Sequence, residues 1–156
     1  MDFEPHVELA RALYTSATLE SARSLAIVES RLWRGDSTPV HVHEAPEAFH
    51  ALEGMLAVFV GGEELELAPG ESVVAPRGVP HAVRAPHGPA RYLSGSLVRS
   101  AARYEDFLRA VAPPLPDAAA WTEGEDAFRL SALGAVNGIS LVGAPGELPV
   151  AAAQAA

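Results

Sequence analysis

Residues 35–54 read GDSTPVHVHEAPEAFHALEG, and this stretch decides how the chain folds. PVHVH (39–43) and EAFHALEG (47–54) are short apolar and polar runs of strand length, and Pro46 separates them. Because successive side chains of a strand point to opposite faces, His41 and His43 share one face and Val40 and Val42 the other. The stretch therefore predicts two consecutive strands, the first of which directs two imidazoles to the same side.

Runs of the same kind continue on both sides of this stretch. Clusters rich in Gly and Pro separate them, which is typical of an all-β sandwich or barrel. The runs are SLAIVESRLW (24–33), MLAVFV (55–60), EELELA (63–68), ESVVAP (71–76), HAVRA (81–85) and ARYLSGSLV (90–98).

The clearest turn is the Gly61-Gly62 pair between MLAVFV and EELELA, because a tight hairpin turn requires positive φ angles. In EELELA, Leu65 and Leu67 fall on one face, and Glu64 and Glu66 fall on the other. This alternation predicts a strand with one buried face and one solvent face.

The sequence pattern changes from strand-like to helical after residue 99. Residues 100–112 predict a helix, with an apolar stripe that we expect to pack on the barrel, and residues 125–136 predict a second helix. Residues 3–24 show only weak helical spacing, and GISLVG (138–143) suggests a last short strand. We therefore predict a single domain over residues 1–148, with the barrel at about 24–98, a helical extension at about 100–142, and a frayed tail at 149–156.

Composition narrows the function classes. The chain of 156 residues has a formal net charge of −9, its eleven cationic residues are all Arg, and it contains no Cys. This balance argues against nucleic-acid binding, and the lack of Cys excludes disulfides and thiolate ligands. The N-terminal segment lacks the pattern of a secretory signal and no apolar run has the length of a bilayer span, so we expect a cytoplasmic protein without a membrane partner.

Four side chains predict a metal centre. His41 and His43 share a strand face, Glu47 opens the next strand, and His81 begins a later one. Three neutral imidazoles and one carboxylate suit a divalent ion, with coordination positions left for water or substrate. Glu44 is a rival carboxylate, but its position in the turn directs it to solvent.

His50 is expected to have a surface or structural role, because Glu47 and Phe49 share the opposite strand parity and His50 therefore faces outward. His6 and His87 have no partners for ligation in the sequence pattern and are expected at the surface.

The spacing of these residues resembles a known family. Gly35-x5-His41-x-His43-x3-Glu47-x6-Gly54 resembles the first cupin motif, and Gly70-x5-Pro76-x-Gly78-x2-His81 resembles the second. The second motif usually ends in Asn, where this chain has Ala85. The resemblance implies a cupin β-barrel (double-stranded β-helix, or jelly roll), the metal ligands His41, His43, Glu47 and His81, and a homodimer. It also implies that Gly35, Gly54, Gly70 and Gly78 lie at turns, where φ is often positive.

Apolar residues with the same strand parity as the ligands are candidates for a cavity lining, although ordinary core packing is the favoured role for each of them taken singly. These candidates are Phe49, Ala51, Val83 and Ala85, with Met55 or Leu56 and Val58 or Leu93 as further possibilities. Trp33 and Tyr92 either touch a substrate or pack at the barrel edge. Arg84 and Arg91 are expected to form surface ion pairs.

Three functions remain open for a barrel with these ligands. The first is a metal-dependent oxygenase, similar to small quercetin-dioxygenase-like cupins, that acts on an aromatic or enol/diketone-type molecule with one divalent ion (Fe, Mn, Ni or Zn). Glu47 would then be both ligand and catalytic base. The second is a Zn-dependent isomerase or polyketide cyclase without redox chemistry. The third is a binding protein for a small ligand without catalysis.

Overall fold

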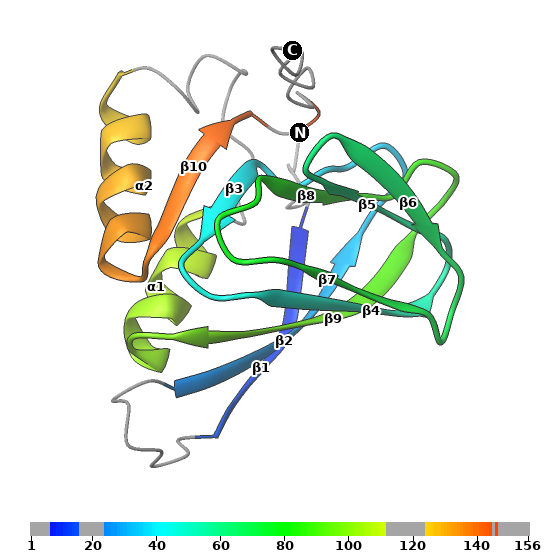
Figure 1. Ribbon diagram of the computed structural model, residues 1–156, viewed down its shortest axis with the longest axis horizontal. Coiled ribbons are helices and arrows are strands. Elements are labelled where there is room, and N and C mark those ends of the chain that lie inside the picture. Colours follow the sequence, from blue (N-terminus) through cyan, green and yellow to red (C-terminus); the bar gives the residue numbers. More distant parts are fainter. Residues whose placement is uncertain (1–6, 16–23, 112–123, 145, 147–156) are drawn as a thin grey trace, which may run out of the picture.

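The computed structural model describes residues 7–15, 24–111, 124–144 and 146, and two five-stranded antiparallel sheets dominate it (Figure 1). The first sheet has the order β1-β2-β9-β4-β7: β1 (Val7–Thr15), β2 (Ser24–Leu32), β9 (Ala90–Val98), β4 (Glu47–Glu53) and β7 (Ser72–Ala75). The second has the order β10-β3-β8-β5-β6: β10 (Ile139–Gly143), β3 (Val40–His43), β8 (His81–Arg84), β5 (Leu56–Val60) and β6 (Glu63–Leu67). The expected all-β barrel with helices in its C-terminal part is confirmed.

The core lies between the two sheets. Phe49 and Tyr92 come from the first sheet, Leu56 and Val83 come from the second, and all four are buried in one apolar cluster. Inward and outward side chains alternate along β9, where Tyr92 and its neighbours of the same parity are buried. This period of two is what allows each strand to contribute one face to the core.

The predicted hairpin is present, but the burial of one leucine in its second strand differs from the expectation. β5 and β6 pair in antiparallel register around Gly61 and Gly62, which both have positive φ (59° and 106°). Leu67 is buried as expected, whereas Leu65 is 41% exposed. β6 is the last strand of its sheet, so the barrel covers only one end of its apolar face.

The secondary structure of the N-terminal segment differs from the prediction. Residues 7–15 form strand β1, which pairs with β2, rather than the weak helix suggested by their spacing. β1 therefore extends the first sheet within the same chain. A strand partner outweighs a weak helical pattern, because local propensity is small beside the energy of tertiary contacts.

Both predicted helices are present, and they lie together at one end of the barrel (Figure 1). α1 (Ala101–Val111) contacts α2 (Gly124–Val136) and the strands β1 and β2, and α2 packs on β10. β10 pairs with β3, so the C-terminal part of the chain returns to the strand that carries two of the predicted ligands. The tail at 149–156 lies outside the described residues.

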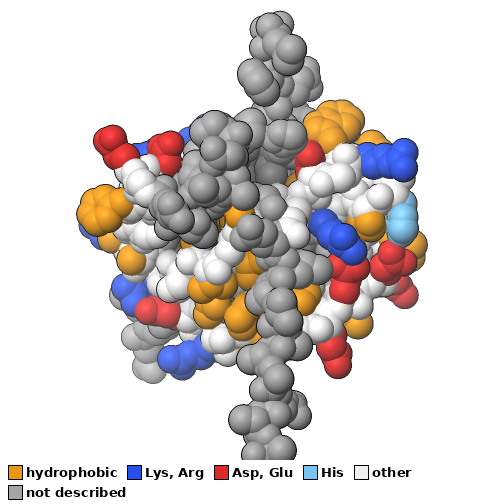
Figure 2. Space-filling model, turned by 90° about the horizontal axis from the view of Figure 1, so that it is seen from above, with side chains coloured by type: hydrophobic (Ala, Val, Ile, Leu, Met, Phe, Trp, Pro, Cys, Tyr) orange, Lys and Arg blue, Asp and Glu red, His pale blue; other side chains and the backbone are white. Residues whose placement is uncertain are grey.

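Ion pairs are distributed over the surface. Arg84 pairs with Glu64, and Arg91 pairs with Glu29 and Glu53, as predicted for these two arginines. On the face in Figure 2, acidic and basic side chains are interspersed at the flanks, and hydrophobic side chains gather toward the middle. No helix in the described parts of the chain is long and apolar enough to cross a bilayer.

Gly54 is the glycine whose replacement should cost the most stability. Its φ is +69°, and a Cβ atom at this position would lie 2.1 Å from the carbonyl oxygen of Pro89. Gly70 is a matched control, since its φ is +92° but a Cβ would meet nothing within 4 Å. Both changes to Ala incur the left-handed cost of about 1–2 kcal/mol, and Gly54→Ala adds a backbone clash.

We expect Gly54→Ala to lose at least about 2 kcal/mol more unfolding free energy than Gly70→Ala, measured by urea denaturation. Equal losses in the two variants would show that the contact with Pro89 does not constrain this turn.

Candidate metal centre

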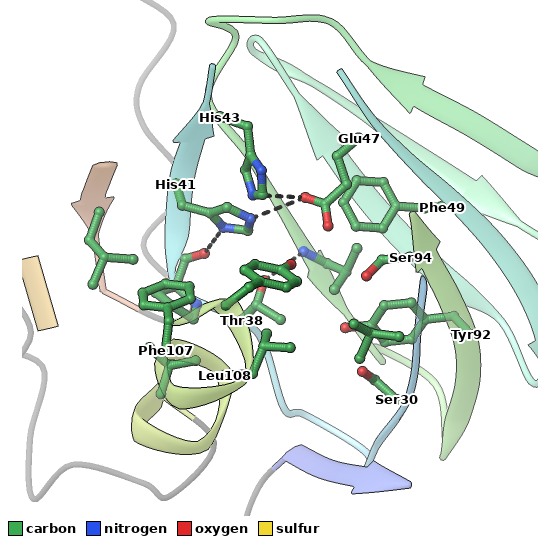
Figure 3. A pocket seen from close by; sticks show the side chains of 16 residues that line it. Ser30, Thr38, His41, His43, Glu47, Phe49, Tyr92, Ser94, Phe107 and Leu108 are labelled. Atoms are coloured by element: carbon green, nitrogen blue, oxygen red, sulfur yellow. Dashed lines mark hydrogen bonds and ion pairs between the residues drawn. The ribbon is translucent and has the colours of Figure 1, made fainter. Parts of the chain in front are cut away.

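The four predicted ligands meet between the two sheets (Figure 3). His41 and His43 lie on β3, and His81 lies on β8 of the same sheet, directly opposite His41 in the strand register. Glu47 lies on β4 of the facing sheet. The cluster therefore joins the two halves of the barrel from the inside.

All three imidazoles contact the same oxygen of Glu47. Its Oε2 lies 3.4 Å from Nε2 of His41, 3.1 Å from Nε2 of His43 and 3.0 Å from Nε2 of His81. One ligand atom from each of the four residues can be chosen so that all lie within 4.8 Å of one another. Glu47, His43 and His81 are at most 4% exposed, so water contributes little to their solvation.

Backbone carbonyls set the protonation of two rings. Nδ1 of His41 lies 2.9 Å from the carbonyl oxygen of Pro39, and Nδ1 of His81 lies 2.7 Å from that of Val79. A carbonyl oxygen only accepts hydrogen bonds, so Nδ1 must carry the proton in both rings. In the neutral rings, Nε2 then presents a lone pair toward the centre of the cluster.

This donor set fits a divalent cation. Lone pairs of neutral imidazoles that face a carboxylate oxygen at 3.0–3.4 Å repel it, unless a proton or a metal ion lies among them. Donor atoms bound at about 2.0–2.2 Å to one ion are themselves separated by about 3.0–3.5 Å, which agrees with these contacts. The cluster could hold a metal ion through nitrogen and oxygen ligands, and the ligand types alone do not select which metal.

Burial and mutual charge change the acidity of these groups. Burial lowers the pKa of His43 to about 4, although the charge of Glu47 opposes the shift. Burial also acts to raise the pKa of Glu47. The charge that His43 carries when it is protonated, and the hydrogen bonds that His41 and His81 donate when a proton rather than a metal ion lies between Nε2 and the carboxylate, outweigh that effect and hold this pKa well below its usual range. Glu47 is therefore an anion at neutral pH, and His43 is neutral, as metal ligation requires.

Main-chain contacts hold the ligand strands in place. The Ser96 hydroxyl on β9 donates to the carbonyl oxygen of Pro46, the residue before Glu47 (3.0 Å). The backbone N–H of Gly78 donates to the carbonyl oxygen of His43 (3.0 Å). The turn glycine of the second motif thus anchors the strand of the first motif.

A cavity opens beside the cluster, with His41, His43 and Glu47 in its wall. His81 is fully buried and does not line the cavity. The cavity has a volume of about 70 Å³, which is room for several waters or a small compact ligand. The second carboxylate oxygen of Glu47 points toward this space (Figure 3).

Two different walls complete the cavity. Polar side chains come from β2, β9 and the segment before β3, whereas apolar side chains come from α1 and the strands around it. The polar residues are Ser30, Thr38, Tyr92 and Ser94, and the residues of α1 are Tyr104, Phe107, Leu108 and Val111.

The other residues selected from the sequence fall into three groups, which lie in the cavity wall, in the core and at the surface. Phe49, Val83 and Tyr92 line the cavity, whereas Ala51, Ala85, Leu56 and Val58 belong to the core between the sheets. Trp33 is 38% exposed, and the guanidinium of Arg31 lies over its ring, so its role is at the surface.

The rival polar residues lie away from the cluster. Glu44 is exposed and pairs with Arg99, as its position in the turn predicted. Nδ1 of His50 lies 2.7 Å from the hydroxyl of Ser72, and the exposed His87 pairs with Glu66. His6 lies outside the described residues.

Sequence reasoning missed part of the cavity wall. Ser30, Thr38 and Ser94 were not selected, and the stripe of α1 was expected to pack on the barrel but not to line the site. A signal was available, because Ser94 has the same parity as Tyr92 on β9. Polar residues at inward positions of a barrel strand indicate a lined cavity more often than a dry core.

Residues 28–95 match the family model described as the cupin domain, and all four candidate ligands fall within this segment. A comparison with curated protein sequences found no match.

Solved structures resemble parts of the chain. DMSP lyase DddQ from Ruegeria pomeroyi DSS-3 is 31% identical over 49% of this chain and 39% of the lyase, with a TM-score of 0.44. Salicylate 1,2-dioxygenase from Pseudaminobacter salicylatoxidans is 28% identical over 46% of this chain and 20% of the dioxygenase, also with a TM-score of 0.44. The protein TT1209 from Thermus thermophilus is 35% identical over 56% of this chain and 90% of its own, with a TM-score of 0.45.

The shifted acidities predict how the metal-free protein responds to acid. The pKa of His43 is lower in the folded chain than its ordinary value of 6.5, so the unfolded chain binds more protons between pH 6.5 and about 4. Stability should therefore fall as pH drops through this window, by at most about 1.4 kcal/mol per pH unit for one group. Glu47 adds a loss of the same sign at lower pH.

Urea denaturation of the metal-free protein between pH 7.5 and 4.5 measures this loss. His43→Gln should flatten the upper part of the profile, and His87→Gln on the surface should leave it unchanged. A profile for His43→Gln that matches the wild type would mean that His43 is not desolvated in the folded chain.

Proposed function

We propose that this cupin is a metal-dependent oxygenase that acts on a small aromatic or enol/diketone-type molecule. His41, His43, Glu47 and His81 would hold one divalent ion, with Fe, Mn or Ni for oxygen chemistry. The supporting observation is the contact of three Nε2 atoms with one buried carboxylate oxygen, where two rings have their Nδ1 protons committed to backbone carbonyls. This arrangement presents lone pairs to a single point.

Glu47 has a second role in this proposal. A divalent ion held by these residues would lower the pKa of a bound hydroxyl or enol and stabilise the negative charge that results. The Glu47 oxygen that points into the cavity is ionised at neutral pH and can accept the proton that such a substrate releases. Its low pKa makes it a weak base, so it serves only a substrate that has been acidified in this way.

The apolar wall supports an organic substrate. Phe107, Leu108 and Val111 of α1 face the cavity and restrict water next to the cluster. A site with little water strengthens electrostatic interactions and protects reactive intermediates from hydrolysis. These residues suit the carbon skeleton of an aromatic or enol-type molecule.

The proposal places the enzyme in the cytoplasm as a homodimer. β7 and β6 each form one of the two edges of their sheet in the described parts of the chain, and an edge strand can pair with a second chain.

Metal binding by these residues is the first test. His81→Ala and His41→Ala should each lower the metal content of the untagged, metal-reconstituted protein at least about tenfold, because loss of a ligand lowers affinity strongly. His50→Ala is the matched control, since His50 contacts Ser72 away from the cluster, and it should retain the ion. Elemental analysis gives the content, and circular dichroism confirms the fold. Full occupancy in both ligand variants would refute the ligand assignment.

Oxygen uptake with flavonols and 1,3-diketones tests the reaction. The protein loaded with Fe, Mn or Ni should consume oxygen, and Glu47→Gln should lower the rate per bound metal by about 10²–10⁴-fold if Glu47 is the base. Retained Zn with no uptake for any reconstituted metal would instead favour an isomerase or cyclase, or a binding protein that does not catalyse a reaction.

A further inference from the structure

Three buried hydroxyl groups form part of the cavity wall. Ser30 is on β2, and Tyr92 and Ser94 are on β9; they are 5%, 4% and 8% exposed. Ser30 and Tyr92 face each other in the strand register, so their side chains lie on the same face of the sheet. Figure 3 shows these three residues below Glu47, with the Tyr92 hydroxyl directed toward the side of Leu108. Nothing in the ligand geometry requires hydroxyl groups here.

The facing hydroxyl groups of Ser30 and Tyr92 have two hydrogens, and at most one of these can be used in a contact between the two side chains. The other hydrogen can serve an acceptor in the cavity. A buried hydroxyl without such an acceptor costs about 1–3 kcal/mol, so this wall favours a ligand that supplies one.

Charge defines the ligand further. Glu47 is the single Asp or Glu among the described residues that line the cavity, and none of those residues is Arg or Lys. A ligand carboxylate on the hydroxyl wall would be desolvated without a cationic partner, which is unfavourable. A neutral carbonyl or ether oxygen meets no such penalty.

We propose that Tyr92, which lies opposite Ser30 in the strand register, is a specificity-determining residue that donates a hydrogen bond to a neutral acceptor oxygen at the end of the substrate remote from the metal ligands. The apolar body of the substrate packs on α1 through Phe107 and Leu108. The substrate class is thus a small, uncharged aromatic or enol-type molecule with an acceptor oxygen, and a second anionic group is selected against. This inference rests on the proposed function for the end of the substrate that meets the metal.

The acidity of Tyr92 agrees with a donor role. Burial, and then the negative charge of Glu47, raises the pKa of Tyr92 above its usual value, although the facing Ser30 side chain opposes this shift. The phenol therefore retains its proton at neutral pH.

Three catechols that share one metal-binding end test the proposal by calorimetry with the full chain loaded with redox-inert Zn. 4-Acetylcatechol offers a neutral acceptor, 4-isopropylcatechol has a similar shape without one, and 3,4-dihydroxybenzoate carries a carboxylate. Wild type should bind 4-acetylcatechol about tenfold more tightly than either of the others. Tyr92→Phe should reduce that preference over 4-isopropylcatechol to about twofold or less, with the affinity for 4-isopropylcatechol itself changed by no more than about twofold.

Tyr104→Phe is the matched control, because Tyr104 is also a buried phenol of the cavity wall but lies on α1. It should keep the preference for 4-acetylcatechol. Equal weakening of all three probes by Tyr92→Phe, loss of the preference in Tyr104→Phe, or tightest wild-type binding of 3,4-dihydroxybenzoate would overturn the assignment.

The two proposals fail in different ways. Zn retained at one ion per chain with no probe bound would reject the inferred substrate class and leave the metal centre standing. Failure to retain Zn would reject the metal centre itself, and the role of Tyr92 would be rejected with it.

Discussion

The structure depends on one carboxylate buried among three imidazoles between two sheets. Glu47 is 3% exposed, and its Oε2 touches the Nε2 atoms of His41, His43 and His81. A buried carboxylate is tolerated only when its charge is compensated. His41 and His81 turn their protonated Nδ1 atoms away from Glu47, so a further proton or a metal ion must lie between their Nε2 atoms and the carboxylate. Without compensation, the buried charge of Glu47 would destabilise the barrel. The need to compensate this charge makes the cluster a candidate site for a cation.

The fold supplies that site by simple geometry. β3 and β8 are neighbours in one sheet, so His41 and His81 stand opposite each other, and β4 in the facing sheet brings Glu47 to them. α1 then covers the open end of the cavity with apolar side chains. The four candidate ligands lie within residues 28–95, which match the cupin domain, whereas this covering helix lies outside that segment. The barrel therefore positions the candidate ligands, and α1 shapes the cavity beside them.

Most strands of the barrel could be predicted from the sequence, because the patterns that indicate them are local. A period of two identified the strands, and paired Gly residues identified the β5–β6 turn, where both φ angles are positive. β1 was not predicted, because its sequence has weak helical spacing. It forms a strand in the structure because it pairs with β2. Leu65 was expected to be buried, but its burial depends on a neighbour that an edge strand lacks.

The sequence by itself determined the strand order of the motifs, the parity of His41 and His43, and the four side chains of the candidate metal centre, since these follow from spacing along the chain. Only the tertiary structure decided which residues form the rest of the cavity. Ser30 meets Tyr92 across two strands that are about sixty residues apart in the chain, and α1 meets β2 and α2 at the barrel end. Such contacts depend on how the sheets and helices pack, and no periodicity within one segment contains that information.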